Sequence, residues 1–132
     1  MHLFTYGTLM FPEVWQAVVG REFAFASGAV FGYKVRRVKN GVYPVMLETI
    51  ATARVAGKIY LDVDEAALGV LDDFESDFYQ RTPVVVNLAD GAQLACHAYV
   101  LPDQRRDWAS DDHWIADEFA RRHLAAYLAG LK

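Results

Sequence analysis

The feature that most constrains the fold of this chain is a succession of short, strand-like segments separated by Gly, Pro, Asn or Asp. The clearest is 54–63 (RVAGKIYLDV), in which Val55, Ile59 and Val63 fall on one face and charged residues fall on the other. Further strands are expected at 2–6, 26–38, 42–47, 83–88 and 93–101, with a hairpin turn at 89–92. So many short strands favour a curled or barrel-like sheet.

Only three segments have helical character. Residues 12–20 carry Pro12 near the first helical position and Gly20 just past the end. A second helix is expected over 64–76 with Asp64 as its N-cap, and a third over 113–130, capped from the SDD tripeptide before it. The expected fold class is therefore α+β, a small mixed, barrel-like β-sheet with few helices and a C-terminal helix. We expect one domain over 1–132, with a helical extension from about residue 111 onward.

Composition argues against several classes of protein. The chain has 132 residues, of which 54% are hydrophobic, so it can bury a substantial core. Its net charge of −4 argues against a nucleic-acid-binding protein, which would need a basic surface. No stretch approaches the roughly 20 apolar residues of a membrane span. Cys96 is the only cysteine, which fits a reducing compartment. We expect a cytoplasmic protein that binds neither nucleic acid nor membrane.

The segment LDDFESD (71–77) contains four carboxylates with different surroundings. In a helix, at about 100° per residue, Glu75 falls between Leu68 and Leu71 on the apolar stripe, whereas Asp73 falls on the opposite side. Because a carboxylate is costly to ionise on such a stripe, its pKa rises toward the range useful for proton transfer near neutral pH. The alternative is a glutamate at a fraying helix end that reaches solvent or pairs with Arg81. Periodicity alone favours this alternative.

The segment TYGTLM (5–10) is the second informative one. A strand that runs into Gly7 and Thr8 exposes backbone N–H groups at a tight turn. Such groups can bind a carboxylate or a developing oxyanion. Gly-Thr turns are common, and an ordinary loop is the alternative interpretation.

The two segments together resemble a known superfamily. YGTL directly after an N-terminal strand, followed by LDDFE and then Tyr79 and Arg81, resembles the gamma-glutamyl cyclotransferase-like superfamily. The more specific resemblance is to the branch of gamma-glutamylamine cyclotransferase and the plant avirulence-induced-like proteins. It runs from Phe4 to about Val86, takes in VYPVML (42–47), and extends to the C-terminal helix of the plant-like members. It implies a small mixed barrel with few helices.

The resemblance also implies roles for individual residues. The glutamate of the family's LD-x-FE motif is its catalytic acid/base and corresponds to Glu75. The substrate loop corresponds to Tyr6, Gly7, Thr8 and Leu9, with Met10 beside it. Tyr79, Arg81 and Tyr43 are candidates for supporting roles. One position departs from the pattern, because the residue after the glutamate is often glycine in the family and is Ser76 here.

The implied activity is that of a cofactor-independent gamma-glutamylcyclotransferase, an acyltransferase. It releases 5-oxoproline and a free amine or amino acid from a small-molecule gamma-glutamyl substrate. The substrate supplies its own nucleophile, the α-amine, so the protein needs a base and oxyanion donors but no Ser-His-Asp or Cys-His machinery. The four histidines lack metal-ligand spacing, and no metal or cofactor is expected.

Two alternatives stay open. A non-catalytic small-molecule-binding protein of the same fold would keep the turn but would have no need of a buried base. A scaffold protein would expose an apolar patch instead of a closed, polar-lipped pocket. The cyclotransferase hypothesis requires Gly7 and Glu75 to face each other across one cavity, because donors and base act at the same substrate carbonyl.

Overall fold

A computed structural model describes residues 1–131 of the chain. Its strands are β1 (Leu3–Thr5), β2 (Phe25–Phe31), β3 (Tyr33–Arg37), β4 (Pro44–Glu48), β5 (Arg54–Tyr60), β6 (Gln80–Leu88) and β7 (Gln93–Val100). The α-helices are α1 (Pro12–Val18), α2 (Glu65–Glu75), α3 (Ala116–Arg122) and α4 (Leu124–Gly130). Short 3-10 turns cover Thr8–Met10, Ser76–Phe78 and Asp103–Trp108. None of the helices within 1–131 has the length and apolar character needed to cross a membrane.

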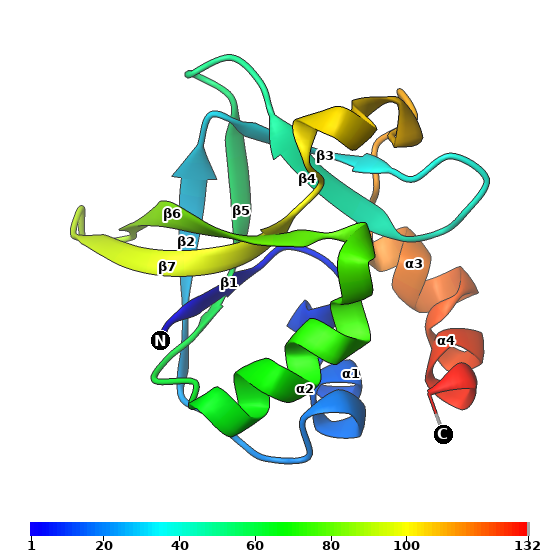
Figure 1. Cartoon of the computed structure of the whole chain (residues 1–132), viewed down its shortest axis with the longest axis horizontal. Helices are drawn as coiled ribbons and strands as arrows, with labels where there is room; N and C mark the ends of the chain where they lie inside the picture. Colours follow the sequence, from blue (N-terminus) through cyan, green and yellow to red (C-terminus); the bar gives the residue numbers. More distant parts are fainter. Residues whose placement is uncertain (132) are drawn as a thin grey trace.

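Five strands form a closed barrel in the order β1-β5-β2-β6-β7, which confirms the expected barrel-like α+β fold (Figure 1). Neighbouring strands are antiparallel except at the closure, where β1 runs parallel to β7 and Leu3 pairs with His97. The interior is filled by alternate residues of each strand, such as Phe4, Ile59 and Val86, each no more than 1% exposed. The alternation in the sequence therefore predicted the barrel core correctly.

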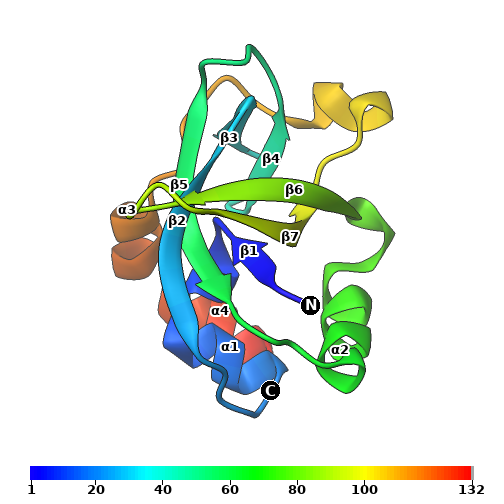
Figure 2. The ribbon, with the colours of Figure 1, turned by 90° about the vertical axis from the view of Figure 1, so that its left-hand side faces the viewer.

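The segment expected as one strand over 26–38 divides at Gly32. Its φ of +85° is a left-handed conformation that glycine adopts without steric cost. Before this residue β2 belongs to the barrel, and after it β3 leaves the barrel to pair with β4. Figures 1 and 2 both place the β3–β4 ribbon on one side of the barrel and α1, α2 and α4 on the opposite side.

A second core lies between the barrel and its helices. Alternation places Tyr60 on the outer face of β5, yet its side chain is only 2% exposed. Helix α1 covers it, and the Trp15 ring stacks on the Tyr60 ring with centroids 3.6 Å apart. The Tyr60 hydroxyl donates a hydrogen bond to the Leu9 carbonyl at 2.9 Å. This core anchors the 6–10 segment against β5.

The prediction of one C-terminal helix over 113–130 is wrong in two respects. Residues 113–115 are not helical, because Ile115 is extended and the Trp114 indole N–H donates to the Val42 carbonyl at 3.0 Å. Asp112, which belongs to the SDD tripeptide expected to cap this helix, instead forms an ion pair with Arg37 at 3.2 Å. The remainder divides at His123, whose φ and ψ of −129° and −20° separate α3 from α4.

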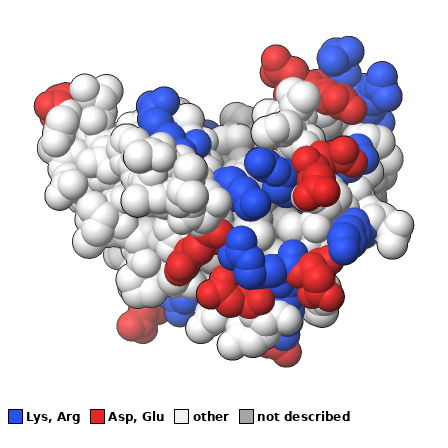
Figure 3. All heavy atoms as spheres, turned by 90° about the horizontal axis from the view of Figure 1, so that it is seen from above, with Lys and Arg blue, Asp and Glu red and all other residues white. Residues whose placement is uncertain are grey.

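Charged side chains of both signs are mixed on the surface. Figure 3 shows Lys and Arg interspersed with Asp and Glu on the face seen from above. The sequence has a short basic run, Arg36, Arg37 and Lys39, and it is partly neutralised because Arg37 pairs with Asp112. Arg36 lies 3.5 Å from the His113 ring nitrogen. Neither arginine lines the cavity that contains Glu75, so this run gives no support to an anion-binding role there.

Candidate active site

Helix α2 carries Glu75 to the cavity. The helix begins at Asp64, whose side chain accepts a hydrogen bond from the Ala67 N–H at 2.9 Å, as the N-cap prediction requires. Leu68 and Leu71 are buried under the barrel, and Glu75 follows Leu71 by about one helical turn. The helical phase therefore aims the carboxylate inward, as the family resemblance implied, whereas periodicity alone favoured the alternative.

Ser76 stops α2 directly after this glutamate. Its φ and ψ of 58° and −165° lie in a region that is populated almost only by glycine. Glycine would adopt this conformation without the strain. The conformation of Ser76 also fixes the direction in which the chain leaves the helix, toward Phe78 and β6.

Replacing this serine by glycine is expected to stabilise the protein. Ser76→Gly should raise the free energy of unfolding by about 1 kcal/mol, because relief of backbone strain exceeds the extra flexibility of glycine in the unfolded chain. Urea denaturation at constant pH measures the change. A fall in stability would mean that the hydrogen bond from the Phe78 N–H to Ser76 Oγ, 3.4 Å long, outweighs the strain.

The turn after β1 forms the facing wall. Gly7 packs so closely on the Pro44 ring that a Cβ atom at this position would overlap the ring. The 3-10 turn at Thr8–Met10 is closed by bonds from the Met10 and Phe11 N–H groups to the Gly7 and Thr8 carbonyls. Within residues 1–131, none of the hydrogen bonds uses the N–H groups of Gly7, Thr8 or Leu9 as donors outside regular structure. These amides have no hydrogen-bond partner within residues 1–131, which is a condition for binding an anion or an oxyanion.

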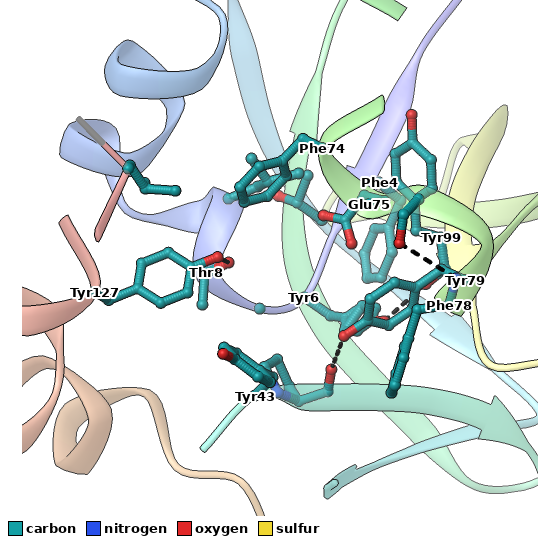
Figure 4. A pocket seen from close by; sticks show the side chains of 16 residues that line it. Phe4, Tyr6, Thr8, Tyr43, Phe74, Glu75, Phe78, Tyr79, Tyr99 and Tyr127 are labelled. Carbon is teal, nitrogen blue, oxygen red and sulfur yellow. Dashed lines mark hydrogen bonds between the residues drawn. The ribbon is translucent and has the colours of Figure 1, made fainter. Parts of the chain in front are cut away.

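Glu75 and the turn line the same cavity, which has a volume of about 360 Å³ (Figure 4). The geometric requirement that Gly7 and Glu75 share one site is thus met. The walls are mainly aromatic, and five tyrosines contribute: Tyr6, Tyr43, Tyr79, Tyr99 and Tyr127. Among the lining residues that the structure describes, Glu75 is the only side chain that can carry a charge near neutral pH. The volume of the cavity suits a small molecule.

The surroundings of Glu75 change its acidity. The side chain is partly accessible through the cavity but is otherwise surrounded by apolar and aromatic groups, and this burial raises its pKa from 4.5 to about 8. Burial and, secondarily, the Glu75 charge raise the pKa of Tyr6 well above its ordinary value. Tyr6 therefore stays protonated as a hydrogen-bond donor, and Glu75 can exchange a proton near neutral pH.

Tyrosine hydroxyls hold the walls together. The Tyr79 hydroxyl donates to the Pro44 carbonyl at 2.7 Å, which fixes the start of β4 against Gly7. The Tyr6 hydroxyl donates to the Tyr99 carbonyl at 2.7 Å and joins the turn to β7. Both bonds are visible in Figure 4. Tyr79 thus contributes to the cavity, as does Tyr43 at its rim, where 47% of the side chain is exposed.

Two of the residues singled out in the sequence lie outside the cavity lining. Met10 is the last residue of the 3-10 turn, and its carbonyl lies 3.5 Å from Lys58 Nζ. Arg81 points to the outer side of α2, where its Nε lies 3.1 Å from Asp72 Oδ1. The alternative in which Glu75 reaches out to Arg81 is therefore wrong, because Asp72 takes that position.

Other contributors were not evident from the sequence. Alternation along β7 groups Tyr99 with outward-facing residues, yet Tyr99 is only 6% exposed and lines the cavity. Its burial follows from α2, since the Tyr99 hydroxyl donates to Asp72 Oδ1 at 2.7 Å. Tyr127 comes from α4, and no motif indicated it. Within residues 1–131 no cluster of three or more His, Cys, Asp or Glu side chains is arranged to hold a metal ion.

Comparisons with known proteins agree with this geometry. Residues 3–116 match the family model described as gamma-glutamyl cyclotransferase, AIG2-like. AIG2-like protein C of Arabidopsis thaliana is 34% identical over 112 residues, which cover 80% of this chain and 64% of the relative. The chain thus spans slightly less than two thirds of that relative.

Solved structures extend the comparison. The crystal structure of an aig2-like protein from Mus musculus superimposes with a TM-score of 0.66 at 26% identity, covering 85% of this chain and 86% of the other. A structure described as a gamma-glutamyl cyclotransferase has a TM-score of 0.68 at 14% identity, covering 99% of this chain and 85% of the other, and shows the shared fold. Sequence, fold and the matched motif region lead to one assignment: the chain belongs to the gamma-glutamyl cyclotransferase, AIG2-like family.

Proposed function

We propose that this protein is a gamma-glutamylcyclotransferase that releases 5-oxoproline and an amine from a small gamma-glutamyl compound. The observation that carries the proposal is that Glu75 and the 7–9 turn, whose N–H groups have no hydrogen-bond partner within residues 1–131, line one aromatic cavity. A base and a set of oxyanion donors facing one another are what this reaction needs from a protein.

The reaction breaks one C–N bond and forms another. The substrate α-amine attacks the carbon of its own side-chain carbonyl, and a five-membered ring closes as the new C–N bond forms. The carbonyl oxygen becomes negatively charged and accepts hydrogen bonds from the turn amides. Glu75 takes the proton that the α-amine loses and gives it to the departing amine as the original amide bond breaks. No oxidant, metal or second substrate is needed.

The cavity also favours the conformation in which the amine can attack. An extended gamma-glutamyl chain must fold back on itself before it can cyclise, and confinement supplies this arrangement. Because burial raises the pKa of Glu75 to about 8, its carboxylate is a stronger base than an ordinary glutamate and is closer in pKa to the substrate α-ammonium group. Proton transfer between two groups of similar pKa has little thermodynamic barrier.

A panel of gamma-glutamyl amides tests the proposal directly. The protein is incubated with each compound, and 5-oxoproline is measured by mass spectrometry, with the Glu75→Gln variant as the matched control. Release of 5-oxoproline by the natural protein and not by the variant is the expected result. Tight 5-oxoproline binding without turnover of any compound would instead favour a non-catalytic small-molecule-binding protein.

Activity and stability should respond to pH in opposite directions. Because the base must be ionised, kcat/KM should rise with pH and approach a plateau above about pH 8, the pKa of Glu75 in the free protein. The bound α-ammonium favours the carboxylate, so the kcat profile should lie at lower pH than the kcat/KM profile. Since the folded pKa exceeds the unfolded value of 4.5, the Glu75 contribution to stability should decline between pH 4.5 and about 8.

Initial rates and urea denaturation at a series of pH values check both trends. In the Glu75→Gln variant the decline of stability over this range should be smaller. A kcat/KM profile with an inflection near pH 4.5, the ordinary value for glutamate, would contradict the assignment of a buried base.

A further inference from the structure

The cavity has a second wall that the catalytic groups do not explain. Tyr127 and Leu131 at the C-terminal end of the chain line it, although both lie outside the 3–116 region that matches the family model. Figure 4 shows Tyr79 and Tyr99 on one side of Glu75, with Tyr127 and Tyr43 on the other. The catalytic groups and this wall therefore come from separate parts of the chain.

The Tyr127 side chain is held firmly at this wall. Its hydroxyl lies 3.3 Å from the Thr8 hydroxyl, within the turn that carries the free amides. Its ring meets the Phe119 ring edge to face at 5.5 Å, and Phe119, which is 2% exposed, stacks on Phe11 at 5.8 Å. Helix α4 is thus anchored to the N-terminal turn by packing and by a hydrogen bond.

The exposure of the lining residues shows where a substrate can extend. Phe4 and Tyr6, on the inner side, are 1% and 8% exposed, so this end is closed. Tyr43, at the rim, is 47% exposed and its ring lies 6.0 Å from the Tyr127 ring. A gamma-glutamyl group held by Glu75 and the turn can therefore direct its leaving amine past Tyr43 and Tyr127.

The side chains beside this part of the cavity, near Tyr43 and Tyr127, are aromatic and uncharged. No Lys, Arg or His is among the cavity-lining residues within 1–131, and the one ionisable carboxylate, Glu75, would repel a second anion. The turn amides are needed for the glutamyl part of the substrate. A carboxylate on the leaving amine would find no cationic partner at this wall, whereas an apolar or aromatic substituent could pack on two tyrosine rings.

We propose that Tyr127 and Tyr43 form the subsite for the leaving amine and that it selects gamma-glutamyl amides of uncharged aromatic or apolar amines over gamma-glutamyl amino acids. This inference rests on the proposed cyclotransferase function. Tyr127 is a specificity-determining residue in it, since it contacts the part of the substrate that departs and takes no part in the proton transfer.

Three substrates with leaving amines of the alkylamine type test the subsite. These are gamma-glutamylbenzylamide, gamma-glutamylmethylamide and gamma-glutamylalanine. The natural protein should prefer the benzylamide in kcat/KM. Tyr127→Ala should reduce kcat/KM for the benzylamide by about fivefold to tenfold, the range expected for loss of an aromatic contact. The methyl group of the methylamide is much smaller than a benzyl group and makes little contact with the Tyr127 ring. Tyr127→Ala should therefore change kcat/KM for the methylamide by less than about twofold.

Leu128→Ala is the matched control. Leu128 is the next residue of α4 and packs in the helix core without lining the cavity. It should leave the preference among the three compounds unchanged even where it lowers stability. An equal loss for all three compounds in Tyr127→Ala would show a structural role only, and preference of the natural protein for gamma-glutamylalanine would overturn the proposed selectivity.

Binding measurements in an inactive variant test the proposed subsite independently of the proposed reaction. Affinities for the benzylamide and gamma-glutamylalanine are measured by calorimetry in Glu75→Gln, with and without Tyr127→Ala, where turnover does not interfere. A benzylamide preference that Tyr127→Ala removes supports the subsite even if the natural protein releases no 5-oxoproline, an outcome that would refute only the proposed reaction. Equal affinities in both backgrounds would refute the subsite.

Discussion

Glu75→Gln should lower turnover by roughly 10²–10⁴-fold, the range expected when a general base is lost. Glutamine has nearly the same shape and can still form hydrogen bonds, but it cannot take the proton from the α-amine. Binding of 5-oxoproline should survive, because the 7–9 turn is unchanged. Stability should hold or rise, more so near pH 8, because the ionised carboxylate is costly among aromatic groups and a neutral amide is not.

Asp73→Asn provides the control on the same helix. Asp73 is exposed and faces away from the cavity, so this change should leave rate and stability nearly unaltered. Steady-state kinetics with one gamma-glutamyl substrate compares the two variants. Normal turnover in Glu75→Gln together with loss of turnover in Asp73→Asn would show that the assignment of the base is wrong. A large loss of stability with normal turnover would make Glu75 a structural residue.

Gly7→Ala should damage both activity and stability. The added methyl group would overlap the Pro44 ring, so either the turn or the start of β4 has to move. Overpacking of this kind destabilises by about 1–3 kcal/mol. Because the turn amides must point at the carbonyl oxygen, a displacement on the order of 1 Å should lower kcat/KM by about 10²-fold.

Gly69→Ala is the matched substitution for this test. A Cβ atom on Gly69, an exposed position within α2, would meet no other atom within 4 Å. Alanine has a higher helix propensity than glycine, so the free energy of unfolding of this variant should rise by up to about 1 kcal/mol. Its kcat/KM should stay normal. Thermal or urea denaturation and kinetics on both variants give the comparison. If Gly7→Ala is as active as the natural protein, the close approach to Pro44 does not position the donors.

Local patterns were sufficient to predict the elements that hold the base and the turn. The inward direction of Glu75 rested on the family resemblance, because periodicity alone favoured a side chain that reaches solvent or pairs with Arg81. Alternation along 54–63 predicted β5, and the Asp64 cap with the apolar spacing of Leu68 and Leu71 predicted α2. These predictions succeeded because each depends on contacts within one element and on which of its faces is apolar. The role of Glu75 in a reaction stays a prediction.

Residues that depend on packing between distant elements could not be predicted. The choice of Asp72 over Glu75 as the partner of Arg81 follows from the way α2 meets β6 and β7. The same packing buries Tyr99, whose position in the alternation of β7 indicated an outward direction. The break at His123, between helix-forming residues, sets the direction of α4 and therefore the position of Tyr127. Periodicity in one segment carries no information on such docking.

The closure of the barrel has a consequence for how the chain is synthesised. Strand β1 leaves the ribosome before the other strands of the barrel, so Leu3 cannot pair until Tyr60 and His97 have been synthesised. Thr8 cannot contact Tyr127, which lies 119 positions later, until that part of the chain has been added. At ordinary rates of translation this wait lasts several seconds. Contacts between residues so distant in sequence also form slowly in a released chain. The nascent chain, with its first strand unpaired, is therefore the form of this protein most exposed to aggregation.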